Sequence, residues 1–331
     1  MKMGGTMNNL INIIGKFKDK KIMVLGDVML DKYIWGEVSR ISPEAPVQIV
    51  NVVKESYAPG GAANVANNIA ALSAKSFMVG VVGKDHTKEQ LVSELKKINI
   101  DVSGLIEDEN KRTIRKVRVF GRNQQLLRFD YEKKGYVDAN TENKIFGFIE
   151  KNMEDSDAII ISDYAKGTIT SSLMEKLIAL CKEKNKIIVV DPKPKHKDFY
   201  KNATLITPNH KEAHEMTGLA EEDSSDVDIE KVGKRLLEDL NSTVLITKGE
   251  KGMSLFEKDG RITNIRTFAK EVFDIVGAGD TSAATLALAL ASGASFEEAA
   301  IIANHAAGIT VGKVGTSTVS IEELRKSIEN G

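Results

Sequence analysis

The chain has 331 residues, of which 42% are hydrophobic and 28% charged, and 46 Lys and Arg face 47 Asp and Glu for a formal net charge of -1. This composition is ordinary for a globular protein, and the length suits one large α/β domain. Because positive and negative charges balance, the net charge gives no reason to expect binding to nucleic acid or to an anionic membrane surface. No stretch reaches the roughly 18–20 apolar residues of a membrane span, so we expect neither kind of partner.

The sequence contains a single cysteine, Cys181, which lies in a stretch with helical spacing. One thiol cannot form an intramolecular disulfide, and this usage indicates a reducing, cytoplasmic location. We expect Cys181 to be a partly buried helix residue.

The first half of the chain predicts a mixture of α/β units and paired strands. Apolar residues at helical spacing predict a short amphipathic helix near residues 8–20, and the apolar run at 22–25 predicts a buried strand. Two β-rich segments, at about 33–57 and 113–131, interrupt the strand–helix order. We expect them to form a small lid on a single domain that spans residues 1–331.

The second half repeats the strand–helix order more regularly. Four short apolar runs end in polar turns and are separated by helical segments: DAIIISD, KIIVVDPK, ATLITPN and TVLITKG. Such βα repeats predict a doubly wound, mostly parallel sheet with helices on both faces. Ligands bind at the carboxyl ends of such strands, where we expect five polar residues to converge: Asp27, Asp163, Asp191, Asn209 and Lys248.

The segment FDIVGAGDTSAATLALALASG carries the strongest chemical signal. Two close glycines can expose successive N–H groups before an Ala-rich helix, and a helix N-terminus of this kind binds anions. Asp280 could act there as the base of a phosphoryl transfer. From this local pattern alone, an aspartate that only caps the helix is equally possible.

A second glycine-containing segment, APGGAANVANNIAALSA, is weaker by itself. Gly60 and Gly61 permit close approach of a polar ligand, and Asn64 could hydrogen-bond sugar hydroxyls. The same residues could be a turn and a helix cap. The GxxxxGK[ST] phosphate loop is absent, and the histidines and cysteine show no metal-ligand spacing.

The paired segments PGGAANVANNIAAL and DIVGAGDTSAA resemble the signatures of the ribokinase-like (PfkB) carbohydrate kinases, over about residues 21–320. Within that family, five further segments are similar to the D-glycero-β-D-manno-heptose-7-phosphate kinases of ADP-heptose biosynthesis: GDVMLDKYIWGEVSRISPEAPVQIV, KVRVFGRNQQLLRFD, SDYAKGTIT, TPNHKE and VGKVGTSTVS. Bifunctional members carry a second, nucleotidyltransferase domain, and the resemblance implies a stand-alone kinase without it.

The resemblance implies a role for Asp280 as the base that deprotonates the anomeric hydroxyl. The backbone amides of Gly277, Ala278 and Gly279 would form an anion hole. Asn209 and Glu212 match an NxxE element that places magnesium–ATP, with Glu212 acting through water. Thr247, Lys248 and Gly249 would lie near the nucleotide, and Asn304 and Gly308 are weaker nucleotide candidates. Carbonyls around Asp274, Val276 and Gly315 could hold K⁺.

For the sugar, Asp27 and Asn64 are the best candidates for hydroxyl contacts. A sugar that already bears a phosphate also needs cationic side chains, and the candidates are Lys116, Arg118, Arg122, Arg128 and Lys193. Lys116 and Arg118 share one face of their strand, which could equally be a solvated face. We expect a small-molecule sugar phosphate and ATP as ligands, and a homodimer formed through the lid.

Three other functions compete with this one. A kinase of a different sugar, such as ribose or fructose 6-phosphate, shares the general signatures. A dinucleotide-dependent oxidoreductase should carry GxGxxG after the first strand, where the sequence has only Leu25-Gly26-Asp27-Val28. A non-catalytic sugar-binding regulator is disfavoured by the presence of Asp280, Asn209 and Glu212.

Overall fold

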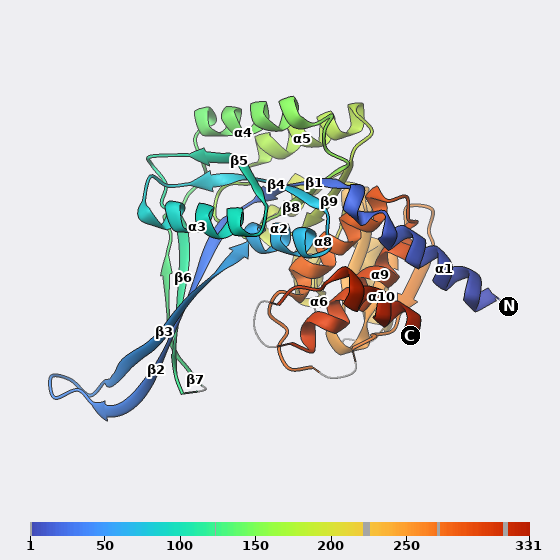
Figure 1. The fold of residues 1–331 in the computed structure, drawn as a ribbon. Helices are drawn as coiled ribbons and strands as arrows, with labels where there is room; N and C mark the ends of the chain where they lie inside the picture. The colour runs from blue at the N-terminus through green and yellow to red at the C-terminus, as the bar shows by residue number, and fades with distance from the viewer. Residues whose placement is uncertain (1, 123, 221–225, 270–271, 314–316) are drawn as a thin grey trace.

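The computed structural model describes residues 2–122, 124–220, 226–269, 272–313 and 317–331, whose strands form two sheets (Figure 1). The larger sheet has nine strands in the order β13-β12-β11-β10-β9-β8-β1-β4-β5. Their bounds are β1 Lys21–Gly26, β4 Lys75–Val82, β5 Asp101–Glu107, β8 Ala158–Ser162, β9 Ile187–Asp191, β10 Leu205–Ile206, β11 Thr243–Thr247, β12 Met253–Phe256 and β13 Ile262–Ile265.

The larger sheet is mostly parallel, as the sequence predicts. Neighbouring strands from β5 through β1 to β11 pair in parallel, whereas β12 pairs antiparallel with β11 and β13 antiparallel with β12. The prediction did not include β5, β12 or β13. The run ATLITPN forms only a two-residue strand, β10, and the chain then passes through an isolated bridge between Asn209 and Thr247 into α6 (His210–Thr217).

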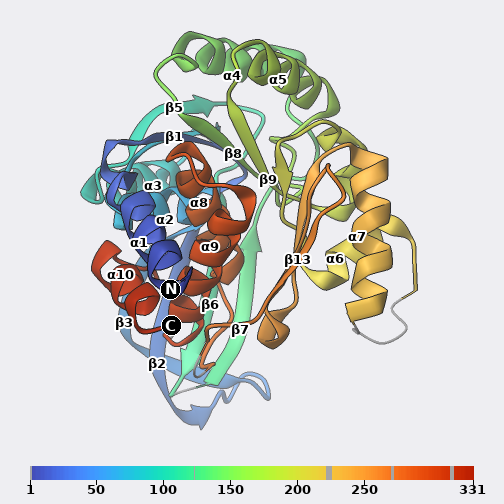
Figure 2. The ribbon, with the colours of Figure 1, turned by 90° about the vertical axis from the view of Figure 1, so that its right-hand side faces the viewer.

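Helices cover both faces of this sheet (Figure 2). The helices are α1 Lys2–Gly15, α2 Ala62–Ala71, α3 His86–Lys97, α4 Ala139–Asn152, α5 Ser171–Glu183, α6 His210–Thr217, α7 Asp226–Leu240, α8 Ala278–Ala291, α9 Phe296–Val311 and α10 Ile321–Asn330. Short 3₁₀ helices are η1 Phe17–Asp19, η2 Pro194–Tyr200 and η3 Gly249–Lys251. None of the described helices is both long and apolar enough to cross a membrane.

Successive side chains of the central strands point to opposite faces of the sheet and contribute to two separate hydrophobic cores. In β1, Ile22 and Val24 pack among α1, α2, α8, α9 and α10, whereas Met23 and Leu25 pack among α4, α5 and α7. Successive side chains of a strand point to opposite faces, so a strand with helices on both sides is apolar throughout. Cys181 is buried in the second core, where burial raises the pKa of its thiol to about 12.

The smaller sheet has four strands in the order β3-β2-β6-β7 and extends away from the helices (Figure 1). Its strands are β2 Val28–Ile41, β3 Gln48–Gly61, β6 Ile114–Gly121 and β7 Gln124–Tyr131. They come from the two β-rich segments of the sequence. Strand β2 begins directly after Asp27, and β3 ends directly before α2. The small sheet is therefore connected to the large sheet at the carboxyl end of β1.

Candidate active site

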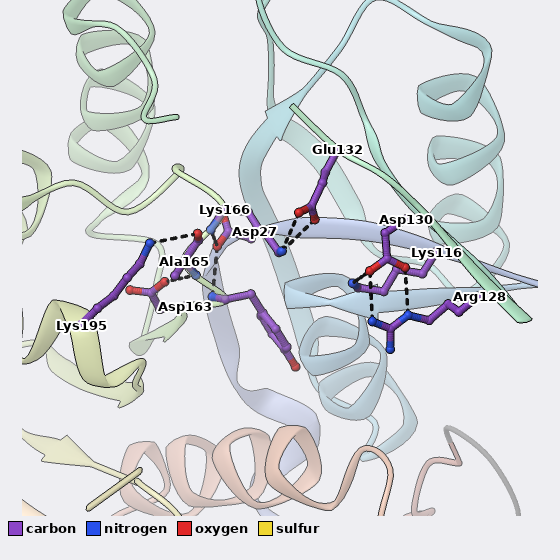
Figure 3. A network of polar contacts seen from close by, with 10 residues as sticks. Asp27, Lys116, Arg128, Asp130, Glu132, Asp163, Ala165, Lys166 and Lys195 are labelled. Atoms are coloured by element: carbon purple, nitrogen blue, oxygen red, sulfur yellow. Dashed lines mark hydrogen bonds and ion pairs between the residues drawn. The ribbon is translucent and has the colours of Figure 1, made fainter. Parts of the chain in front are cut away.

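Polar residues gather at the carboxyl ends of β1, β8 and β9 (Figure 3). Asp27 follows β1, Asp163 follows β8, and Asp191 is the last residue of β9. These strands are adjacent and parallel, so their ends meet at the same edge of the sheet. The convergence that the sequence predicts for these three residues is therefore present.

Asp280 lies in the first turn of α8 and is buried, with 7% of its surface exposed. Its carboxylate accepts hydrogen bonds from Asn64 Nδ2, at 2.6 Å, and from the Tyr164 hydroxyl, at 2.9 Å. The N-cap residue of α8 is Gly277, with φ of 86° and no side-chain cap. Asp280 is thus bonded to side chains from α2 and from the loop after β8, which disfavours an ordinary helix cap.

The protonation state of Asp280 suits a base. Burial raises its pKa to about 6, while the hydrogen bonds from Asn64 and Tyr164 favour the ionised form and oppose that shift. Burial also raises the pKa of Tyr164 well above its usual value, so the hydroxyl remains a donor to Asp280. At neutral pH the carboxylate of Asp280 is therefore mostly ionised and available to accept a proton.

A polar ladder joins α2 to α8 next to Asp280. Asn68 Oδ1 accepts a hydrogen bond from Thr281 Oγ1 at 2.8 Å, and Asn68 Nδ2 donates to the carbonyl of Asn64 at 2.9 Å. Asn64 is 1% exposed, and its Oδ1 has no hydrogen-bond partner among the described residues. The hydrogen bond from its Nδ2 holds the amide of Asn64 against Asp280.

Gly60 and Gly61 let β3 turn tightly into α2. Gly61 has φ of 56°, and a Cβ on it would lie 2.5 Å from the carbonyl oxygen of Asp27. A Cβ on Gly60 would lie 2.9 Å from Oδ2 of Asp31. The two glycines therefore allow close packing against the residues that flank the start of β2.

Asp27 is 1% exposed, and both of its carboxylate oxygens accept backbone hydrogen bonds. Oδ2 accepts from the amides of Tyr164, at 3.0 Å, and Lys166, at 2.9 Å, and Oδ1 accepts from Thr168 at 3.1 Å. The sugar contact that the sequence predicts at Asp27 stays a prediction. The carboxylate is enclosed by the loop after β8 and orders the segment that carries Tyr164.

Asp163 organises the other end of the same loop. Its Oδ2 accepts a hydrogen bond from the Tyr200 hydroxyl at 2.7 Å and lies 2.6 Å from Nδ1 of His196, while Oδ1 accepts from the amide of Ala165. The Tyr136 hydroxyl lies 2.8 Å from Nε2 of His196. Asp163, His196 and Tyr200 are buried, so we assign the network to holding the loop in place.

Lys193 and Glu212 form an ion pair beside Asp280. The ammonium of Lys193 lies 5.6 Å from the centroid of the Tyr164 ring and bonds Oε1 of Glu212. Glu212 Oε2 accepts from the amide of Asn209 at 3.1 Å, and Asn209 Oδ1 accepts from the amide of Glu212 at 3.0 Å. The NxxE element is therefore the capping box of α6, with one oxygen of Glu212 turned to Lys193.

Asp191 is the remaining carboxylate of this group. Burial raises its pKa well above the usual value, and the charges of Asp280 and Glu212 raise it further, while Lys193 lowers it. Asp191, Asp280 and Glu212 thus interact electrostatically with one another and with the ammonium of Lys193. Carboxylate oxygens of this kind suit a divalent cation, which would also favour their ionised forms.

The other nucleotide candidates lie along the neighbouring elements. Thr247 ends β11 and donates its amide to the carbonyl of Pro208, and Lys248 and Gly249 begin the following turn. Asn304 in α9 is buried and donates to the carbonyl of Arg266 at 2.6 Å. Gly308 lines a cavity of about 500 Å³ with the stacked rings of Phe268 and His305.

The expected monovalent cation site is only partly described. Asp274 Oδ1 accepts a hydrogen bond from the amide of Val276 at 3.0 Å, whereas Gly315 lies outside the described residues. No group of three or more His, Cys, Asp or Glu residues within the described ranges could hold a metal ion directly. A divalent ion would therefore need water and phosphate ligands as well.

The cationic candidates of the small sheet are paired with carboxylates. Arg118 Nη1 lies 2.8 Å from Oδ1 of Asp31, and Asp31 is 4% exposed. Lys116 and Arg128 both bind Asp130, at 3.1 Å and 2.9 Å. Arg122 is exposed at the turn between β6 and β7, away from this cluster.

Sequence reasoning left Tyr164, Asp31 and Asp130 out of the candidate residues. Tyr164 is in SDYAKGTIT, one of the segments that carry the family resemblance, and this was the available signal. Asp31 and Asp130 gave no signal, because their neighbours depend on how the strands pair. Asp31 is opposite Lys116 but pairs with Arg118, two residues further along β6, and Lys116 is opposite Asp130.

The chain is similar to known proteins over most of its length. The family model described as "pfkB family carbohydrate kinase" matches residues 19–324. The bifunctional protein HldE of Geobacter metallireducens is 46% identical over 96% of this chain and 64% of that protein. HldE of Desulfatibacillum aliphaticivorans is 43% identical over 96% of this chain and 65% of that protein. The chain thus spans less than two thirds of these curated relatives.

Solved structures share the fold at low identity. A ribokinase from Arabidopsis thaliana, complexed with ribose and ATP, has a TM-score of 0.70 at 19% identity and covers 94% of this chain and 98% of that chain. Phosphofructokinase-2 from Escherichia coli, in complex with potassium, has a TM-score of 0.75 at 20% identity with the same coverage. Both comparisons confirm the predicted ribokinase-like α/β fold with its second small sheet.

Proposed function

The chain belongs to the pfkB family of carbohydrate kinases, and on that premise we propose that it phosphorylates the anomeric C1 hydroxyl of D-glycero-D-manno-heptose 7-phosphate to give the 1,7-bisphosphate. The segments similar to heptose-7-phosphate kinases support this substrate, as do the HldE relatives at 46% and 43% identity. A sugar hydroxyl as the acceptor follows from family membership. The heptose and the carbon atom are the proposal.

The observation that carries the proposal is the buried carboxylate of Asp280, with a pKa near 6, at the first turn of α8. Asp280 would take the proton of the sugar hydroxyl as the hydroxyl oxygen bonds to the γ-phosphorus. The bond between the γ-phosphorus and the β,γ-bridging oxygen breaks, and ADP leaves. Asn64 and Tyr164 orient the base through their hydrogen bonds to its two oxygens.

The start of α8 supplies donors for the transferred group. The first hydrogen bond of the helix runs from the amide of Thr281 to the carbonyl of Gly277, so the amides before Thr281 have no partner within the helix. We assign the anion hole to Gly277, Ala278 and Gly279, although the Ala278 amide lies 3.3 Å from the carbonyl of Ile275. Amides fixed in this way stabilise charge that develops on phosphoryl oxygens.

ATP and a divalent metal ion fit the remaining residues. The carboxylates of Asp191 and Glu212 lie beside Asp280 and Lys193, which suits Mg²⁺ held largely by water and phosphate oxygens. The ion would neutralise charge on the phosphates. Thr247, Lys248 and Gly249 would contact the nucleotide, and the cavity beside Gly308 is the candidate for its base.

Residues 1–331 would act as a single kinase domain, with the small sheet as its lid. The face of β7 opposite the ion pairs exposes Leu127 by 51% and Phe129 by 44%. Exposed apolar side chains on a projecting sheet favour burial against a second copy, which supports the expectation of a homodimer. Light scattering that gives a monomer mass at micromolar concentration would contradict it.

The test is an ATP-consumption assay across a panel of sugars and sugar phosphates, including both anomers of heptose 7-phosphate. We expect the highest kcat/KM with one of these anomers and a product that carries a new phosphate on C1. A higher kcat/KM for ribose, fructose 6-phosphate or any other acceptor would show that the enzyme is a kinase of that sugar instead.

A further inference from the structure

A cavity of about 310 Å³ lies between the segment after β7 and the loop after β8. Four lysines line it, and the structure brings them together from three separate parts of the chain: Lys133, Lys134, Lys166 and Lys195. We call this cavity the lysine pocket. None of these lysines was among the residues that the sequence predicted for the site.

The lysine pocket has an excess of positive charge. Its one lining carboxylate, Glu132, is paired with Lys166 at 2.7 Å. Lys195 Nζ lies 3.4 Å from the carbonyl of Ala165, and neither Lys133 nor Lys134 has an ion pair with a described side chain. Three ammonium groups are therefore available to an anion at neutral pH.

The cationic side chains of the small sheet, in contrast, are already paired with carboxylates. Arg118 is paired with the buried Asp31, and Lys116 and Arg128 share Asp130. A phosphate that bound there would have to displace these carboxylates, and the displacement of Arg118 would leave the Asp31 carboxylate buried without a partner. Figure 3 shows the two groups apart, with Lys166 and Lys195 on one side and Lys116, Arg128 and Asp130 on the other.

The lysine pocket also borders the residues that surround Asp280. Tyr164, which donates its hydroxyl to Asp280, is followed directly by Ala165 and Lys166 of the pocket wall. Asp27 accepts the amides of both Tyr164 and Lys166, so one carboxylate fixes the spacing between the base and the pocket. The residue that bonds Asp280 and one wall of the lysine pocket therefore belong to the same loop.

We propose that the lysine pocket binds the phosphate monoester of the acceptor sugar, while Asp280 engages the hydroxyl at the other end of the molecule. The inference rests on the proposed function, because it requires an acceptor that already carries a phosphate. Lysine binds a phosphate dianion as a mobile point charge, and a mobile charge suits a pocket whose lysines are mostly exposed. The pocket thus selects phosphorylated over unphosphorylated acceptors.

The test compares two double variants of equal net charge. Lys133→Ala/Lys134→Ala changes the pocket, and Lys144→Ala/Lys151→Ala changes two exposed lysines of α4. We expect the pocket variant to raise KM for heptose 7-phosphate by about ten- to a hundredfold, the range for lost charge-assisted contacts. Its KM for ATP and for the heptose without phosphate should stay within about twofold, and the control variant should match the wild type. Lys195→Ala should reproduce part of the effect.

The outcomes separate the pocket from the substrate. Retention of the wild-type KM for heptose 7-phosphate by the pocket variant would overturn the pocket assignment and leave the proposed function intact. If the wild type prefers a different sugar phosphate and the pocket variant loses that preference, the heptose proposal is overturned and the pocket assignment is supported. A wild type without preference for any phosphorylated acceptor would overturn both.

Discussion

Asp27 and Asp31 lie four residues apart, both are buried, and burial raises the pKa of both, yet the chain stabilises them in different ways. Asp27 accepts three backbone amides from one loop of the large sheet. Asp31, on the small sheet, is paired with the side chain of Arg118. Only a substitution by proline removes a backbone amide, whereas any substitution of Arg118 removes its guanidinium. The large-sheet end is therefore fixed by the fold and the small-sheet end by side-chain identity.

This difference separates the part of the site that would carry out the chemistry from the part that would recognise the sugar. The chemical groups around Asp280 are positioned by backbone-anchored loops and buried helices. The small sheet offers side-chain pairs that substitution can rearrange without disturbing the main core. Recognition of different sugars would then change by substitution on the small sheet and around the lysine pocket, while the base remains in place.

We expect the substitution Asp280→Asn to have the largest effect on turnover. Turnover should fall by about a thousandfold or more, since a general base contributes roughly 10²–10⁴ and the anionic partner of the hydroxyl is also lost. Steady-state kcat measures this, with thermal unfolding as the control for a retained fold. Unchanged turnover would remove Asp280 from the role of base.

Asp27→Asn tests the backbone-anchored carboxylate. The amide has one acceptor oxygen, so at least one of three buried N–H groups loses its partner, and stability should fall by about 3 kcal/mol. Urea unfolding measures this change. The exposed Asp155→Asn is the matched control and should change stability by less than about 0.5 kcal/mol. Equal stabilities for the two variants would contradict the organising role of Asp27.

A double-mutant cycle on Asp31 and Arg118 tests the side-chain pair. Arg118→Met should destabilise the protein by about 2 kcal/mol, because it leaves a buried charge without its partner. Adding Asp31→Asn should recover at least about 1 kcal/mol of that loss, measured by urea unfolding. Strict additivity of the two substitutions would show that the pair is not coupled.

Tyr164→Phe should move the pH dependence of kcat/KM. The base is active when ionised, so activity should fall as pH drops through its pKa of about 6. The hydroxyl of Tyr164 favours the ionised form, and without it the pKa rises. The acidic limb should therefore shift to higher pH, by up to about one unit. Tyr136→Phe, which loses only the contact with His196, should leave the limb in place.

The sequence predicted those parts of the site that local patterns define. The glycines before α2 and α8 drew attention to Asn64 and Asp280 as site residues. In the structure the side chain of Asn64 hydrogen-bonds that of Asp280. The α/β order and the parallel sheet followed from apolar runs with polar ends. The helix α4 and the strands β5, β12 and β13 were not predicted, although α4 has the capping aspartate Asp138 before it.

Partners that depend on tertiary contacts could not be predicted. Alternation placed Lys116 and Arg118 on one face, but it could not show that Asp31 and Asp130 neutralise them. Asp27 was placed at the right strand end, but its backbone partners could not be predicted, because the loop that encloses it comes from 137 to 141 residues later in the chain. The lysine pocket needs three distant segments at once, and no local pattern marks it.

The buried thiol of Cys181 has a practical consequence. With its pKa raised to about 12 it stays protonated, and it is the single cysteine of the sequence. Maleimide dyes react with the thiolate of accessible cysteines. A cysteine introduced at Glu44, an exposed position between β2 and β3, would therefore take up the dye selectively. Fluorescence from that position would report in real time how the projecting sheet responds to each ligand.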